Sequence, residues 1–217
     1  MRRQAAIMAA AFMTALPAFA SDGFDELEEL AALWSIADEP FRPVTRELDK
    51  PPFVHQKTLT ITAESLARGW VPNSQCHRNF PLFPALQISF SEGAVRHMEI
   101  VERSGVEEAW VDEPTIQMKR TRPETTLCFV SENRTMSYND ISGEYQMTVG
   151  PYYLKLFDGY FPLDVDLTIE YPAELLRFSS MEPASVEGAT IDHREGRIRF
   201  DALFEGKLLL VFRFKPA

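Results

Sequence analysis

An eight-residue alternation between positions 164 and 171 constrains the fold more than any other part of this sequence. Apolar side chains or a tyrosine occupy every odd position, and polar side chains occupy every even one. A period of two places successive side chains on opposite faces of an extended chain, so the pattern predicts a β-strand with one buried and one wet face. The apolar face consists of Val165, Leu167, Ile169 and Tyr171, and the polar face of Asp164, Asp166, Thr168 and Glu170.

Short strands are predicted along most of the remaining chain. These segments are residues 57–62, 85–90, 95–101, 110–119, 125–131, 136–138, 145–149, 175–179, 190–193, 197–200 and 206–215. Turn-forming residues separate them, and residues 85–90 and 95–101 are predicted to pair as a hairpin. Short strands at this spacing are typical of sandwiches and barrels. We therefore expect a mainly β protein with an immunoglobulin-like, sandwich-type architecture in two parts.

Two segments between these strands have other patterns. Residues 64–68 favour one turn of helix that ends at Gly69, because glycine accepts the left-handed conformation that closes many helices. Residues 70–84 contain three prolines and three large aromatic side chains without a clear period. This second segment is predicted to be an irregular loop that a disulfide holds in place.

The first twenty residues have the features of a secretory signal peptide. Arg2 and Arg3 precede a short apolar run, and Ala18-Phe19-Ala20 has the small-x-small form of a cleavage site. The run is too short to span a bilayer, and no later segment approaches 18 consecutive apolar residues. We expect cleavage after Ala20 and a periplasmic protein that does not span the membrane.

Residues 21–52 are predicted to be an acidic amphipathic helix followed by a proline-rich arm. Pro40 ends the helix, and four prolines between positions 39 and 53 favour an extended chain. The apolar face of the helix packs either on the protein's own sheet or on a partner. Its apolar side chains recur at spacings of three and four: Phe24, Leu27, Leu30, Ala31 and Trp34.

The remaining chain is predicted to form a first β-domain at residues 53–158 and a smaller sandwich-like domain at residues 159–217. The segment from Val165 onward, with VDLTIEYPAELLRFSS, an IRF strand and a closing LLLVFRFK, resembles cohesin-like and other bacterial immunoglobulin-like β-sandwiches. The resemblance implies a sandwich fold for this part. It includes no functional motif, so it assigns no binding residue.

The two cysteines, Cys76 and Cys128, are predicted to form one disulfide in an exported protein. On the chain-entropy model, closing a loop of about fifty residues contributes roughly 4 kcal/mol of stability. The alternative is a metal site shared with His77 and His97. No CxxC or HxxxH spacing supports that alternative.

Charge and motifs exclude several function classes. Loss of Arg2 and Arg3 leaves 20 basic against 32 acidic residues, a net charge of −12 that disfavours nucleic acid and anionic membranes. No G-x-S-x-G, G-x-G-x-x-G or P-loop motif is present, so we expect no enzyme activity and no cofactor. Asp158, Asp164 and Asp166 offer a calcium site or an acid–base pair, but a solvated strand face explains them more simply.

Aromatic side chains provide the remaining candidate surface for a ligand or partner, with core packing as the alternative. They are Trp70, Trp110, Tyr152, Tyr153, Tyr160 and Phe161. From these observations we expect an exported, non-catalytic interaction or assembly module of the bacterial cell envelope that binds a protein partner. The alternative expectation is a carbohydrate- or calcium-binding β-sandwich module.

Overall fold

The computed structural model describes residues 39–156 and 159–217. The chain divides into two units, Met1–Ala37 and Asp38–Ala217, and the described residues belong to the second. The predicted signal peptide, its cleavage after Ala20 and the helix at residues 21–38 lie outside the described residues. Within the part described, no helix is long and apolar enough to cross a membrane.

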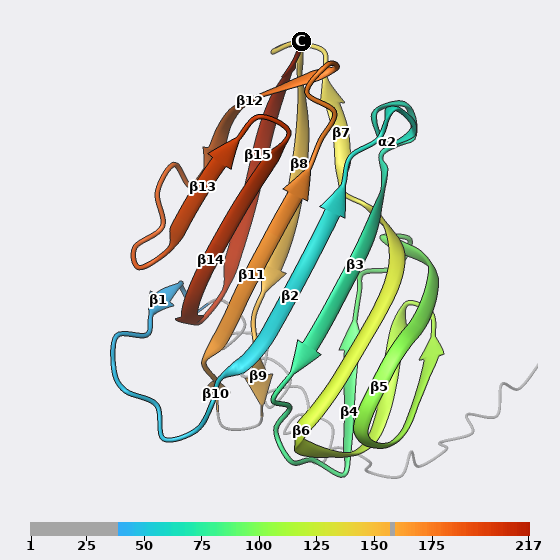
Figure 1. Cartoon of the computed structure of the whole chain (residues 1–217), viewed down its shortest axis with the longest axis vertical. Coiled ribbons are helices and arrows are strands. Elements are labelled where there is room, and N and C mark those ends of the chain that lie inside the picture. The colour runs from blue at the N-terminus through green and yellow to red at the C-terminus, as the bar shows by residue number, and fades with distance from the viewer. Residues whose placement is uncertain (1–38, 157–158) are drawn as a thin grey trace, which may run out of the picture. The chain divides into compact units, whose positions relative to one another are not determined.

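The described chain is mostly β-structure in two main sheets, which confirms the predicted mainly β fold. The larger sheet has nine strands (Figure 1). In spatial order its main path is β1 (Arg42–Pro43), β14 (Arg197–Glu205), β11 (Leu163–Glu170), β2 (Phe53–Thr60), β3 (Trp70–Arg78), β6 (Thr115–Arg134) and β4 (Ala85–Ser89), while β13 (Thr190–Arg194) pairs with β14 and β5 (Val95–Asp112) with β6.

The larger sheet is continuous across the predicted domain boundary. Strand β11, which follows the boundary, lies parallel to β2, which precedes it, with Val165 opposite His55. On its other side β11 pairs antiparallel with β14. Segments from both sides of residue 158 therefore build one sheet.

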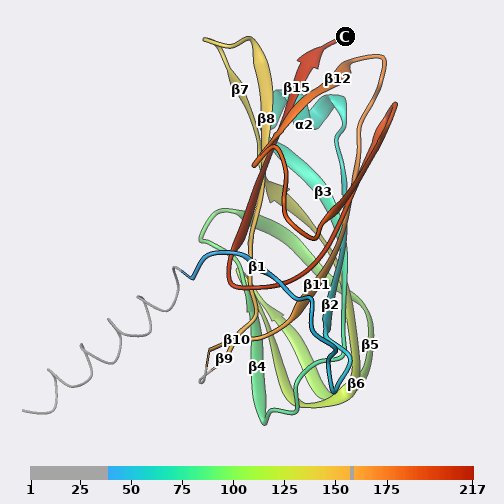
Figure 2. The same ribbon diagram turned by 90° about the vertical axis from the view of Figure 1, so that its left-hand side faces the viewer.

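The smaller sheet covers part of the larger one. Its four strands are β12 (Leu176–Glu182), β15 (Leu208–Pro216), β8 (Glu144–Tyr152) and β7 (Met136–Asn139). Figure 2 shows β7 and β8 on one side of the molecule and β11 and β2 on the other. A short third pair, β9 (Lys155–Leu156) and β10 (Gly159–Tyr160), follows β8.

Apolar side chains from both sheets form one core, which we call the sandwich core. On β11, Val165, Leu167 and Ile169 are fully buried, and the four alternate residues Leu208, Leu210, Phe212 and Phe214 of β15 face them. The predicted alternation in both strands is confirmed. Burial of each such side chain contributes roughly 1.5–3 kcal/mol, so these strands fix the register of the two layers.

A second core lies inside the bend of two long strands at one end of the larger sheet. Strands β5 and β6 form a hairpin across Glu113-Pro114, and both curve strongly (Figure 1). The register of β5 shifts at three places along this hairpin, which is how bulges increase local twist and bend. The buried residues of this ribbon core are Phe80, Val95, Met98, Ala109, Ile116, Met118, Leu127 and Phe129.

Several predicted details of this region are wrong. Residues 85–90 do not pair with residues 95–101, because β4 pairs with the start of β6. Residues 110–119 are not one strand, since the chain reverses at Glu113-Pro114. The TRPE sequence at residues 121–124 is not a turn between strands, because β6 continues through it.

Residues 70–78 are also not an irregular loop but the nine-residue strand β3, between β2 and β6. The preceding helical turn is confirmed as α2 (Ala63–Arg68), with Thr62 as its N-cap. Gly69 closes it with a φ of 80°, a left-handed conformation that favours glycine. Within the proline-rich arm, β1 pairs with the end of β14.

Candidate functional site

Polar side chains occupy inward-facing positions on three adjacent strands of the larger sheet. Most of these residues are buried, and they replace the apolar residues expected inside a sandwich. We call them the polar band. Its members are His55 and Lys57 of β2, Asn73, Gln75 and His77 of β3, and Ser131 and Asn133 of β6.

Strand register brings these residues together from distant parts of the chain. His55 lies opposite His77, and Lys57 lies opposite Gln75. Asn73 in turn lies opposite Ser131 of β6. Directly opposed side chains have Cβ atoms about 4.5–5.5 Å apart, so the band is one contiguous cluster.

The polar band separates the two apolar cores. Along β3 the chain passes from Val71 in the sandwich core, through the band, to Phe80 just beyond the strand in the ribbon core. Along β2 it passes from Leu59 in the sandwich core to Phe53, which packs against both cores. The band is therefore an interior layer of polar atoms between two apolar regions.

Hydrogen bonds within the band are incomplete. His55 Nε2 and Gln75 Oε1 are 3.0 Å apart, and Asn73 donates to Ser131 Oγ at 2.9 Å. Several buried polar atoms have no partner among the described residues: Asn73 Oδ1, Gln75 Nε2, both ring nitrogens of His77 and the hydroxyl of Tyr152. An unpaired buried polar group costs about 1–3 kcal/mol of stability. A cluster of such groups therefore requires an explanation.

Burial dominates the electrostatics of the band. It lowers the pKa of Lys57 to about 8. It also lowers the pKa of His55 to about 3, with a further contribution from the charge of Lys57 that the hydrogen bond to Gln75 partly offsets. The pKa of His77 lies well below its ordinary value because of burial, His55 and Lys57. At pH 7 both imidazoles are therefore neutral and Lys57 is mainly charged.

The charge of Lys57 is not balanced by a nearby acid. The band contains no aspartate or glutamate, and Lys57 forms no ion pair or hydrogen bond with another described residue. Its side chain is only 6% exposed. Buried charges in proteins are normally paired, so Lys57 is an exception.

A metal site is not assembled in the part of the chain that the structure describes. No group of three or more His, Cys, Asp or Glu side chains is close enough there to hold a metal ion. His55 and His77 are neighbours, with ring centroids 4.3 Å apart, but the adjacent cation Lys57 opposes a second positive charge.

The sequence-predicted aromatic residues are distributed over three places. Tyr152 is buried, and its ring packs edge-on against His55 with centroids 5.1 Å apart, so it borders the polar band instead of the surface. Tyr153, which is half exposed, approaches Tyr160, and Phe161 follows it at the end of β10. Trp70 lies elsewhere, under the guanidinium group of Arg96 at 4.2 Å.

The sixth aromatic residue, Trp110, lies on β5 and is 40% exposed. Beside its strand, a surface groove of about 450 Å³ lies within the bend of β5 and is lined by Ile100, Val101, Glu102, Arg103 and Ala109. Arg103 crosses the bend and donates a hydrogen bond to the carbonyl oxygen of Ala109 at 3.0 Å.

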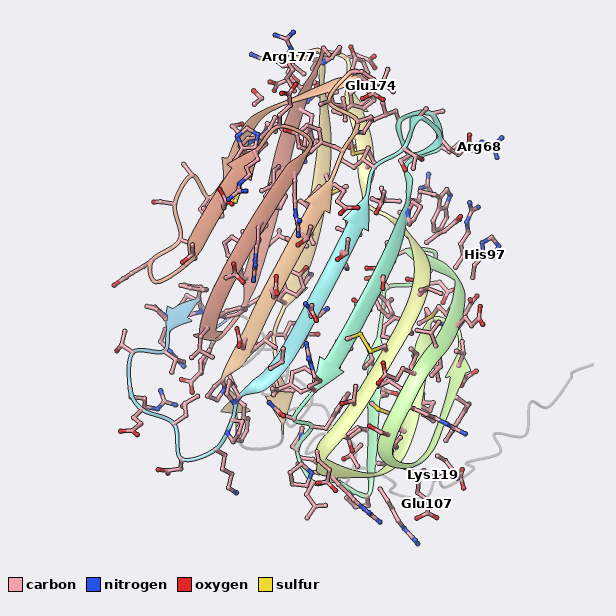
Figure 3. All side chains as sticks on the ribbon, in the orientation of Figure 1. Arg68, His97, Glu107, Lys119, Glu174 and Arg177 are labelled. Carbon is pink, nitrogen blue, oxygen red and sulfur yellow. A yellow bond between two sulfur atoms is a disulfide. The ribbon has the colours of Figure 1, made fainter. Side chains whose placement is uncertain are left out.

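The acidic residues around this groove differ in their pairing. Glu107 and Glu108 pair with Arg120 and Lys119 at the outer end of the ribbon, where Figure 3 shows Glu107 and Lys119 projecting from it. Glu99 and Glu102 form no ion pair with any residue that the structure describes. Both are exposed on β5, and Glu102 lines the groove together with the cation of Arg103.

Asp164 and Asp166 lie on the outer face of β11. Arg199 binds Asp166 at 3.3 Å and Asp201 at 3.0 Å, so one cation of the protein is shared by two of the three carboxylates on this face. Burial, with Asp201 and Asp166 nearby, raises the pKa of Asp164 above its ordinary value. Asp158, the third predicted member of this cluster, lies outside the described residues.

The predicted disulfide between Cys76 and Cys128 is confirmed. The two residues lie directly opposite each other on β3 and β6, and their bond is on the outer face of the larger sheet. Figure 3 shows sulfur atoms bonded between these strands. His77, the next residue in the sequence, points inward and His97 is exposed on β5, so the alternative metal site is not formed.

Sequence reasoning missed the polar band, although a signal for it was present. His55 and Lys57 occupy the same alternate positions as Leu59 and Ile61, which are buried. The same parity connects Val71 with Asn73, Gln75 and His77 on β3. Comparison with known proteins adds no family assignment: the sequence matches no protein-family model, and no curated protein is significantly similar to it.

Proposed function

We propose that this chain is an exported, non-catalytic interaction module of the bacterial cell envelope, and that it binds a protein partner at the β5 ribbon. The observation that carries the proposal is the groove within the bend of β5. Val101 lines this groove and is 56% exposed, and Ile100 and Ala109 add apolar surface. Apolar side chains in a concave site are the usual anchors of protein interfaces.

Charge around the groove favours a basic partner. Strand β5 contains five acidic and two basic residues, and the groove is lined by Glu102, which has no ion pair with a described residue, and by Arg103. Complementary charge accelerates association and disfavours acidic partners. We therefore assign the groove to an extended or loop segment of a protein that combines lysine or arginine with one apolar side chain.

The mode of binding is through side chains and not through strand addition. The three register shifts in β5 interrupt the row of free backbone groups that an added strand needs, and such bulges protect sheet edges. An immunoglobulin-like relationship of the two sheets and a periplasmic location belong to the same proposal. Sandwich domains of that class commonly bind partners through one face or loop cluster.

Site-specific photo-crosslinking tests the proposal in cells that export the protein. A photo-reactive phenylalanine at Val101 should give a discrete covalent adduct with one envelope protein, and the same probe at Ile191 on β13, which is 40% exposed, should not. The double variant Glu99→Lys, Glu102→Lys should reduce the adduct at least tenfold. Equal adducts at both positions, or none at Val101, would contradict the proposal.

A further inference from the structure

The polar band has more unsatisfied donors than acceptors. The ammonium group of Lys57 is not among the fully buried unpaired atoms, but it forms no hydrogen bond with another described residue, and Gln75 Nε2 is a buried donor without a partner there. A neutral His77 ring adds one donor and one acceptor, and the Tyr152 hydroxyl can act as either. The remaining unpartnered acceptor is Asn73 Oδ1. Whatever completes this cluster must mainly accept hydrogen bonds.

Charge decides between the occupants that could satisfy these donors. Water accepts hydrogen bonds but leaves the cation of Lys57, a residue that is only 6% exposed, without a counter-charge. A metal ion adds positive charge next to Lys57 and finds only two imidazoles. An anion satisfies the donors and balances the charge together.

We propose that the polar band binds a small monovalent carboxylate, with Lys57 as its charge partner and with Gln75 and His77 as hydrogen-bond donors. The site is independent of the groove on β5, and it goes beyond the proposed interaction function. One negative charge matches the single cation of the band, whereas a divalent phosphate would leave a buried excess of negative charge.

Burial limits the size of this ligand. Gln75 is 2%, His77 3% and Lys57 6% exposed. A ligand that contacts these side chains must therefore be small enough to be enclosed by the protein. The neighbouring layers are apolar, with Phe129 stacked on His77 at a centroid distance of 5.8 Å. A carboxylate with a hydrogen atom or a short alkyl group presents its two oxygens to the donors and its apolar end to these cores.

The proposal has a specific pH signature, because the anion needs the charged form of Lys57. Without ligand the pKa of Lys57 is about 8, so binding is nearly constant at lower pH and weakens tenfold for each pH unit above that value. At pH 9.5 the affinity should be about 30-fold lower than at pH 7. The other titratable groups facing Lys57 stay neutral in this range: His55 and His77 have lowered pKa values, and burial raises that of Tyr152.

Equilibrium urea unfolding of the mature protein tests this proposal, because the buried site can fill while the chain refolds. Sodium acetate and sodium formate at 50 mM should raise the unfolding midpoint at pH 7 relative to sodium chloride at equal ionic strength. The rise should be lost at pH 9.5. It should also be lost in Lys57→Met, and it should persist in the control Lys119→Met, which removes an exposed lysine.

A second variant covers the case that Lys57→Met does not fold. His77→Phe keeps a ring beside Phe129 and removes one donor, so it should weaken the acetate effect several-fold. Two outcomes would overturn the proposal: acetate and chloride acting alike on the unaltered protein, or an acetate effect that survives in Lys57→Met.

Discussion

Protonation of His55 should destabilise the protein in mild acid. The pKa of this side chain falls from an ordinary 6.5 to about 3 in the folded state, chiefly because of burial. In the unfolded chain the imidazole gains its proton near pH 6.5, whereas the folded protein resists protonation. The unfolded state therefore binds more protons between these values, and stability is lost as the pH falls through this window.

The magnitude follows from the difference between the two pKa values. Each unit corresponds to about 1.36 kcal/mol, so the full window represents a loss of about 5 kcal/mol. Between pH 7.5 and pH 4.5 the loss attributable to His55 is about 2.7 kcal/mol. A domain with a total stability of about 5–15 kcal/mol will register this clearly.

The assay is urea unfolding of the unaltered protein and of His55→Phe at pH 7.5 and pH 4.5. Phenylalanine keeps a ring next to Tyr152 but does not titrate. Surface carboxylates contribute equally in both proteins, so the difference between the two pH-dependent losses reports His55 together with its effect on the neighbouring His77. Equal losses in the two proteins would refute the reasoning and would place the imidazole in contact with water.

Three further outcomes are expected. Replacing Cys76 and Cys128 by serine should cost roughly 4 kcal/mol in urea unfolding, and two blockable thiols in the unreduced protein would contradict the disulfide. Gly206→Ala should lower the melting temperature, because φ is +87° there and a Cβ would overlap the carbonyl oxygen of Pro40; an unchanged value would show that the arm moves freely. Millimolar calcium should leave the melting temperature unchanged, and a rise that disappears in Asp166→Asn would establish a calcium site on the outer face of β11.

Strands with one face in the apolar core and the other toward solvent could be predicted from the sequence. In β11 and β15 every inward residue is apolar, so the period of two is visible without knowledge of the partners. The helical turn before Gly69 was equally accessible, since it depends on local capping. These elements are confirmed because the forces that define them act within a few neighbouring residues.

Pairing between strands was less accessible. The sequence suggests a hairpin wherever two strand-like segments flank a turn, yet β4 pairs with β6 and not with β5. The 20-residue length of β6 decides this, because its first part has room for a strand on either side. Such a choice depends on the bend of the ribbon, which no local pattern encodes.

The strand β3 was missed for the same physical reason that makes the polar band interesting. Asn73, Gln75 and His77 point inward, while Pro72 and Ser74 point outward, so the segment is polar on both faces and shows no hydrophobic period. Only after β3 is placed between β2 and β6 do its inward positions align with Lys57 and Ser131. The candidate site therefore became visible through register and not through composition.

An interior layer of this kind is not what stability alone would select. The depressed pKa of Lys57 corresponds to about 3 kcal/mol that the folded protein loses at neutral pH by holding this charge inside. An apolar side chain at position 57 would extend the sandwich core by one residue beyond Leu59 and remove that cost. Each neighbouring unpaired polar group further lowers the stability of the folded protein by about 1–3 kcal/mol. A bound anion converts these costs into interactions, which is why a ligand accounts for the band better than packing does.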